Sequence, residues 1–208
     1  NLLLPSLFTK TKRIDAFFDE EIERIIQLNL DPIVASPNKQ VNILSNDKNC
    51  SVQITNNSLY DTSLIWIEKI NHPVEPKGGT RLSSVYQLQP FELALKDTIR
   101  IGIRYGNKIK NMSLYYYNQK HGWTFLPSSM HSNRQIISST LFSLDAITIM
   151  QDIEPPFIRK VFPEDGGKFH YKDLKTISII ADDYLSGLNS NEKSMEIKLD
   201  GLTVRYAF

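Results

Sequence analysis

The chain has 208 residues, a formal net charge of +1 and a single cysteine. The balanced charge argues against a protein whose main task is to hold a nucleic-acid backbone, because such proteins concentrate lysine and arginine. One cysteine excludes an internal disulfide and a cysteine-based zinc site. Hydrophobic residues make up 41% of the chain, which is enough for packed cores. No apolar run approaches the roughly 20 residues of a membrane-spanning helix, so no span is predicted.

Residues 1–36 differ in pattern from the rest of the chain. Between Ile14 and Ile26 the apolar residues recur three, four or eight positions apart, with acidic residues on the other side. This spacing predicts one short amphipathic helix. Its acidic face disfavours an anionic membrane surface and favours packing on the protein itself. We expect residues 1–36 to form an N-terminal helical segment or the end of a preceding module.

From residue 37 onward, apolar and polar residues alternate in short runs, which is the period of a β-strand. Polar turns separate the runs. The predicted strands lie at residues 41–43, 50–54, 64–67, 85–88, 99–105, 112–116, 123–126, 134–139 and 145–150. So many strands without an intervening helix predict a mainly β protein, with a β-sandwich domain over residues 37–153.

Pro155 and Pro156 mark the next predicted boundary, because tandem prolines suit a short stiff connector better than a central strand. Further strands are expected at residues 157–163, 176–181, 195–199 and 203–206. Residues 154–208 amount to about half of the ~100 residues of an immunoglobulin-like sandwich. We therefore expect them to be the first part of a truncated domain of that kind.

Two stretches of the sequence resemble known modules. The run from Ile177 to Leu188, followed by Leu199-Asp200-Gly201, resembles the opening of immunoglobulin-like modules in large bacterial secreted and cell-envelope proteins, where a strand leads into Asp-x-x-Ser-Gly-Ile/Leu. Residues 58–63, 85–90 and 114–126 are similar to β-sandwich regions that accompany secreted zinc endopeptidases of the lysostaphin type. The resemblance implies tandem immunoglobulin-like modules in a secreted, periplasmic or cell-surface protein.

The same resemblance implies a non-catalytic region: a spacer, adhesion or substrate-positioning module of a larger exported bacterial protein. The alternative is the accessory region of a secreted cell-wall zinc peptidase whose catalytic domain lies outside this chain. The zinc-binding elements of that peptidase family, His-x-x-x-Asp and His-x-His, do not occur around His72, His121, His131 or His170. The candidate partners are cell-wall or surface polysaccharide and neighbouring domains of the same protein.

Carboxylates near the predicted boundary are candidate calcium ligands. Asp152 and Glu154 lie at the connector, and Asp182 and Asp183 lie in a predicted turn of the next domain. Calcium prefers such hard oxygen ligands. The spacing does not match an EF-hand loop, and aspartates in turns commonly bind their own backbone. A structural calcium ion is the one cofactor that the sequence suggests, and turn formation is the alternative role.

A binding face is predicted on two neighbouring strands. Arg100 and Arg104 alternate with isoleucines, and Tyr115 and Tyr117 lie opposite the apolar face of their strand. If the two strands pair as a hairpin, the four side chains share one face. That face could stack on sugar rings or hold an acidic polymer. The alternative is ordinary cross-strand stabilisation.

No nucleophile is predicted. Cys50 is in register with Val52 and Ile54, so we expect it to point inward as a small hydrophobe. The chain has no Gly-x-Ser-x-Gly elbow, and its Gly-Gly pairs lack the pattern of a phosphate-binding loop. The sequence therefore predicts no catalytic residue in this chain.

Overall fold

The computed structural model of the chain describes residues 32–164, 166–170, 172, 175–188 and 196–205. The predicted N-terminal helix lies outside these residues. The chain divides into two compact units. Unit 1 runs up to Pro76 and continues over Thr80–Gln151, and unit 2 comprises Lys77–Gly79 and the chain from Asp152 onward. The described residues are mainly β, as the sequence predicts.

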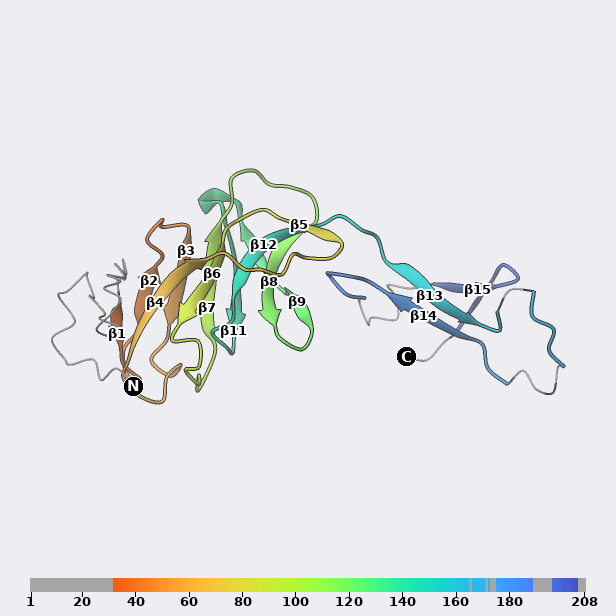
Figure 1. Cartoon of the computed structure of the whole chain (residues 1–208), viewed down its shortest axis with the longest axis horizontal. Helices are drawn as coiled ribbons and strands as arrows, with labels where there is room; N and C mark the ends of the chain where they lie inside the picture. Colours follow the sequence, from red (N-terminus) through yellow and green to blue (C-terminus); the bar gives the residue numbers. More distant parts are fainter. Residues whose placement is uncertain (1–31, 165, 171, 173–174, 189–195, 206–208) are drawn as a thin grey trace, which may run out of the picture. The chain divides into compact units, whose positions relative to one another are not determined.

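In the described part of unit 1, the strands form two antiparallel sheets (Figure 1). The strand order of the seven-stranded sheet is β1-β4-β6-β12-β8-β9, with β5 paired to β12. Its strands are β1 (Ile33–Ala35), β4 (Ser63–Ile70), β5 (Gly79–Arg81), β6 (Val85–Gln89), β8 (Met112–Asn118), β9 (Gly122–Leu126) and β12 (Ile147–Asp152).

The five-stranded sheet has the order β10-β11-β7-β3-β2 among the described residues. Its strands are β2 (Val41–Leu44), β3 (Cys50–Ile54), β7 (Ile99–Arg104), β10 (Ser129–His131) and β11 (Ile136–Leu141). A short 3-10 turn, Ser132–Arg134, joins β10 to β11. The strands predicted between residues 41 and 150 are thereby confirmed, with small shifts in their bounds. The unpredicted strands β1, β5 and β10 have three residues each, too few to show alternation.

One hydrophobic core lies between the two sheets, which gives unit 1 its sandwich-like build. In β7 the isoleucines are buried and the arginines exposed, so one face of the strand turns inward. Both sheets contribute fully buried side chains to a single cluster: Ile43, Val52, Ile54, Ile101 and Ile103 from one sheet, and Ile65, Leu88, Leu114 and Ile149 from the other. Each such burial contributes about 1.5–3 kcal/mol to stability.

Cys50 belongs to this core, which confirms the predicted inward orientation. It has no exposed surface. Burial, together with the negative charge of Asp47, raises the pKa of the Cys50 thiol far above its ordinary value. Because only a thiolate is an effective nucleophile, the side chain is a packing group.

Unit 2, within its described residues, consists of two antiparallel strand pairs. The first joins β13 (Phe157–Phe162) to β14 (Ser178–Asp182), and the second joins β15 (Ile197–Leu199) to β16 (Leu202–Val204). The second pair turns through Asp200 and Gly201, both with positive φ, which is typical of a two-residue Asp-Gly hairpin turn.

Candidate functional site

The predicted pairing of the arginine strand with the tyrosine strand is wrong. β7 pairs with β11 and β3, whereas β8 pairs with β12 and β9, so the two strands belong to different sheets. Residues 105–111 carry the chain from one sheet to the other instead of forming a tight turn. Because the apolar side of each strand faces the common core, the arginines and tyrosines lie on opposite outer surfaces of the sandwich.

The four residues of the predicted face also differ in exposure. Arg100 and Arg104 are exposed on the outer side of the five-stranded sheet. Tyr115 is 1% exposed although it points away from the core, and its ring makes an edge contact with Phe125. Tyr117 is half-buried. The outer side of β8 is therefore partly closed to solvent, whereas Phe125 on β9 is 37% exposed.

Aromatic and backbone contacts tie the connection between β4 and β6 to this outer side. We call the unit 1 residues of this connection, 71–76 and 80–83, the covering segment. The His72 ring lies 4.2 Å from the Tyr117 ring and 4.8 Å from the Trp123 ring, measured between centroids. The indole N–H of Trp123 donates a 2.8 Å hydrogen bond to the Val74 carbonyl. The segment thus packs on β8 and β9 through aromatic contacts.

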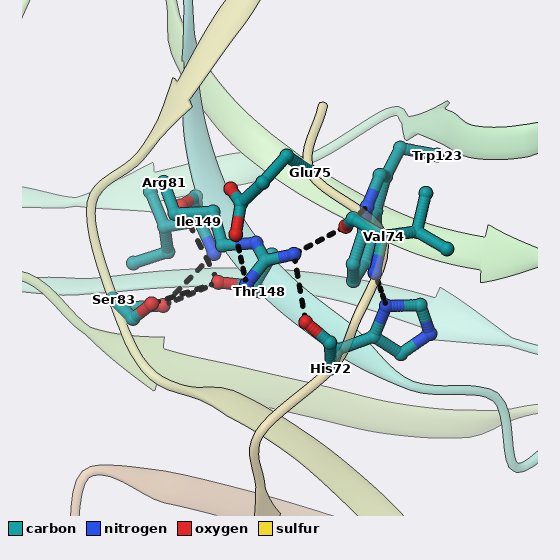
Figure 2. A network of polar contacts seen from close by, with 8 residues as sticks. All are labelled: His72, Val74, Glu75, Arg81, Ser83, Trp123, Thr148 and Ile149. Carbon is teal, nitrogen blue, oxygen red and sulfur yellow. Dashed lines mark hydrogen bonds and ion pairs between the residues drawn. The ribbon is translucent and has the colours of Figure 1, made fainter. Parts of the chain in front are cut away.

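Arg81, at the end of β5, organises the covering segment (Figure 2). Its guanidinium donates hydrogen bonds to the backbone carbonyls of His72, at 3.1 Å, and Val74. It also lies 3.2 Å from the Glu75 carboxylate and 5.5 Å from the centre of the Trp123 ring. Glu75 is 76% exposed, so the ion pair adds little. One guanidinium nitrogen donates to both carbonyls, and this pair of charge-assisted hydrogen bonds is the main contribution.

The environment of His72 favours its neutral form. Burial against the rings, together with the positive charge of Arg81, lowers the pKa of His72, and the negative charge of Glu75 acts in the opposite direction. The Nδ1 atom accepts a 3.3 Å hydrogen bond from the Val74 amide. A neutral imidazole therefore packs on the aromatic pair.

The far end of the covering segment is fastened to β12. The Ser83 hydroxyl accepts a 2.9 Å hydrogen bond from the Ile149 amide, and the Ser83 carbonyl accepts one of 3.1 Å from the Thr148 hydroxyl. The Leu82 amide donates to the Ile149 carbonyl at 2.8 Å. Thr148 is fully buried by these contacts. The network in Figure 2 therefore holds a long connection against the sheet.

Sequence reasoning missed this network. Its members come from the β4–β6 connection, β5, β9 and β12. Because these elements are far apart in the sequence, no local residue spacing predicts that they are in contact. Trp123 and Phe125 alternate with Thr124 and Leu126, so the sequence does not show which side of β9 faces the core, and the structure places Trp123 on the outer side, opposite Tyr117.

The structure gives the candidate calcium ligands other contacts. Asp182 lies 3.4 Å from the Arg159 guanidinium. One oxygen of Asp183 accepts hydrogen bonds from the amides of Leu185 and Gly187, both at 3.0 Å, and from the Ser186 hydroxyl at 3.3 Å. Asp183 thus forms its own turn.

Among the described residues, no group of three or more histidine, cysteine, aspartate or glutamate side chains is placed to hold a metal ion. Asp152 ends β12 and Glu154 follows it in the connector. His121 is exposed in the β8–β9 turn, and the His131 ring contacts the Ser138 hydroxyl at 2.9 Å. A calcium ion at the connector stays a prediction from the sequence.

No protein-family model matches this chain, and no curated protein sequence matches it. In the described ranges no helix has the length and apolar character needed to cross a membrane.

Proposed function

We propose that this chain is a non-catalytic binding and spacing region of a larger exported bacterial protein, built from tandem immunoglobulin-like modules. The observation that carries the proposal is the succession of two antiparallel β units along the chain, with Pro155 and Pro156 between β12 and β13. Tandem β modules on a short proline-containing connector suit a region that spaces or presents other parts of a protein.

The use of polar side chains supports a scaffold role. Arg81 directs hydrogen-bond donors at backbone carbonyls of the covering segment. Tyr86 and Asp47 bond to each other. These groups fix loops on a rigid frame, which is what a binding module needs of its framework.

The structure explains the motif on which the resemblance to secreted modules is based. In Asp183-x-x-Ser186-Gly187-Leu188, the aspartate binds the backbone and the serine hydroxyl within the motif. Gly187 has φ of +72°, a conformation that favours glycine. The residues that resemble secreted modules thus form a defined turn, which supports their use as a fold signal.

The proposal is tested with the purified 208-residue chain and isolated bacterial envelopes and peptidoglycan sacculi. We expect the chain to pellet with at least one of these materials and to release no soluble sugar or peptide from either. Release of fragments would contradict a non-catalytic role. Failure to pellet with either material would contradict the binding role. The heat-unfolded chain is the control for nonspecific adsorption.

A further inference from the structure

His72 attaches the covering segment to the sheet through its ring and through its backbone. The ring lies against the rings of Tyr117 and Trp123, with centroids 4.2 Å and 4.8 Å away. The backbone carbonyl accepts a 3.1 Å hydrogen bond from Arg81. The covering segment therefore depends on a residue that titrates near neutral pH when it is unperturbed.

The hydrogen bond between Val74 and the imidazole belongs to the neutral form of His72. The Val74 amide donates to Nδ1 at 3.3 Å, and a ring nitrogen that accepts a hydrogen bond carries no proton. Protonation places an N–H of the imidazolium against the N–H of Val74, and two donors cannot bond to each other. Figure 2 shows this contact at the edge of the polar network.

Val74 is also the residue that holds the segment on β9. Its carbonyl accepts the 2.8 Å hydrogen bond from the Trp123 indole and a second one from the Arg81 guanidinium. Pro73 and Pro76 have fixed φ angles, so few backbone torsions remain to absorb a displacement of the Val74 amide without moving its carbonyl. A change at Nδ1 of His72 is thereby passed on to both anchoring bonds.

The charges that act on His72 come from two elements. Arg81, at the end of β5, places a positive charge beside it and so disfavours the imidazolium. Glu75, in the segment itself, favours the imidazolium. Its carboxylate is 76% exposed and is paired with Arg81, so solvent and that ion pair both weaken its effect on the ring. The strands β8 and β9 present the uncharged rings of Tyr117 and Trp123.

The indole of Trp123 cannot fully compensate a cation at His72. The Arg81 guanidinium already lies 5.5 Å from the centre of that ring. A cationic His72 would share the ring with it, so attraction to the ring is opposed by repulsion between the two cations. Burial against the rings adds to this repulsion, and the pKa of His72 is lowered as a result.

We propose that His72 is a pH-sensitive switch, whose protonation loosens residues 71–76 from β8 and β9 and opens the rings of Tyr117 and Trp123 to solvent. Trp123 is 7% exposed when the segment is docked. In the loosened segment the imidazole regains its ordinary pKa of about 6.5, so this form takes up the proton first as pH falls. The docked form is fully stabilised above that pH and loses stability as pH falls through its own lower value.

The test is a titration of the whole chain by NMR between about pH 8 and pH 5, which brackets the ordinary titration of histidine. The readouts are the titration of the His72 ring, the protection of the Val74 amide against hydrogen exchange, corrected for the intrinsic rate at each pH, and the exchange of the Trp123 indole N–H. No ligand is needed, so the outcome is independent of the proposed binding function.

Three variants separate the switch from other effects of pH. His72→Asn does not titrate but keeps a side-chain oxygen that accepts from the amide two residues on. Glu75→Gln removes the negative charge that favours the imidazolium and leaves the ring in place. His121→Asn is the matched control, because His121 is exposed in the β8–β9 turn. Thermal melting of each variant checks its folding.

We expect the protection of the Val74 amide in wild type to fall with pH by up to about tenfold per pH unit, along the titration of the His72 ring, while exchange of the Trp123 indole rises. His72→Asn should abolish this response, and His121→Asn should retain it. Glu75→Gln should move the midpoint to lower pH.

Two results overturn the proposal. One is a His72 ring that titrates without any change in Val74 protection or Trp123 indole exchange. The other is the same response in folded His72→Asn as in wild type. Should His72→Asn fail to fold, the exposed position of Glu75 keeps the proposal testable, because an unmoved midpoint in Glu75→Gln also contradicts it.

Discussion

The phenol of Tyr86 donates a 2.7 Å hydrogen bond to the Asp47 carboxylate, and this bond joins the two sheets of unit 1. The Tyr86 ring is buried in the core as part of β6, and Asp47 lies in the turn between β2 and β3. The same carboxylate accepts a 2.6 Å hydrogen bond from the Ser45 hydroxyl and one of 3.1 Å from the Asn49 amide. A tight turn of one sheet is thereby fastened to a central strand of the other.

Replacing Tyr86 by phenylalanine tests this bond. The ring stays in the core, and the carboxylate loses one donor while keeping Ser45 and the Asn49 amide. Hydrogen bonds to charged groups contribute about 1.5–3 kcal/mol, and Asp47 is exposed enough for water to replace part of the loss. We expect the free energy of unfolding to fall by about 1–2 kcal/mol, measured by urea denaturation.

Tyr60 offers the matched control for that measurement. It is 62% exposed, on the β3–β4 connection. Tyr60→Phe should change the free energy of unfolding by less than about 0.5 kcal/mol. Equal effects of the two substitutions would show that the cross-sheet bond adds no stability.

The Asp47 carboxylate should make the stability of unit 1 depend on pH. Partial burial alone would raise its pKa, but the hydrogen bonds from Ser45, Tyr86 and Asn49 outweigh burial and lower the pKa below its ordinary value. The unfolded state therefore takes up a proton first as pH falls. The stabilisation is complete above the unfolded pKa of about 4 and is lost as pH falls through the lower folded value.

Asp47→Asn isolates this contribution, because the amide keeps the shape of the side chain but does not titrate in this range. We expect urea denaturation between about pH 2 and pH 6 to show a shallower acid loss of stability for Asp47→Asn than for wild type. Asp61→Asn, at an exposed residue of the β3–β4 connection, is the control. Identical pH slopes for Asp47→Asn and wild type would refute the linkage.

Alternation predicts the strands because it reports burial residue by residue. Ile99, Ile101 and Ile103 identify both the extent of β7 and its inward face, and the structure agrees. Pairing depends instead on contacts between distant residues, such as that of Ser139 with Ile101 across β11 and β7. Alternation therefore predicted correctly that Arg100 and Tyr115 point away from the core. It could not show that their strands, β7 and β8, lie in different sheets.

The covering segment shows a second limit of sequence reasoning. Residues 71–76 lack alternation, and hydrogen bonds from Arg81 and Trp123, in other elements, hold them in place. His72 looks like an ordinary turn histidine until the ring of Tyr117 is placed 4.2 Å away. Such long-range contacts produce no periodic pattern in the sequence.

Arg81→Lys should loosen the covering segment while leaving the sandwich core folded. A lysine ammonium is a compact charge that cannot at once serve the carbonyls of His72 and Val74, pair with Glu75 and contact the Trp123 ring. We expect a loss of about 1–2 kcal/mol in local stability, seen as faster hydrogen exchange over residues 71–78 and altered Trp123 fluorescence. Arg100→Lys, on the exposed face of β7, should leave both unchanged. Unaltered exchange in Arg81→Lys would mean that aromatic packing alone holds the segment.

Asp183→Ala should destabilise unit 2 at the turn after β14. The substitution removes one acceptor from two amides and a hydroxyl, and the neighbouring Leu185 is 5% exposed. Loss of such a turn acceptor costs about 1–2 kcal/mol. We expect faster hydrogen exchange over residues 178–188, whereas Glu164→Gln, an exposed carboxylate elsewhere in unit 2, should have no effect.

The same exchange experiment decides between the turn role and the calcium role of Asp183. Its oxygen already accepts amide hydrogens at 3.0 Å, and no cluster of ligands surrounds it among the described residues. We therefore expect millimolar calcium to leave exchange over residues 178–188 of the wild-type chain unchanged. Protection of residues 178–188 by calcium in wild type, absent from Asp183→Ala and reversed by a chelator, would show instead that this carboxylate binds the metal.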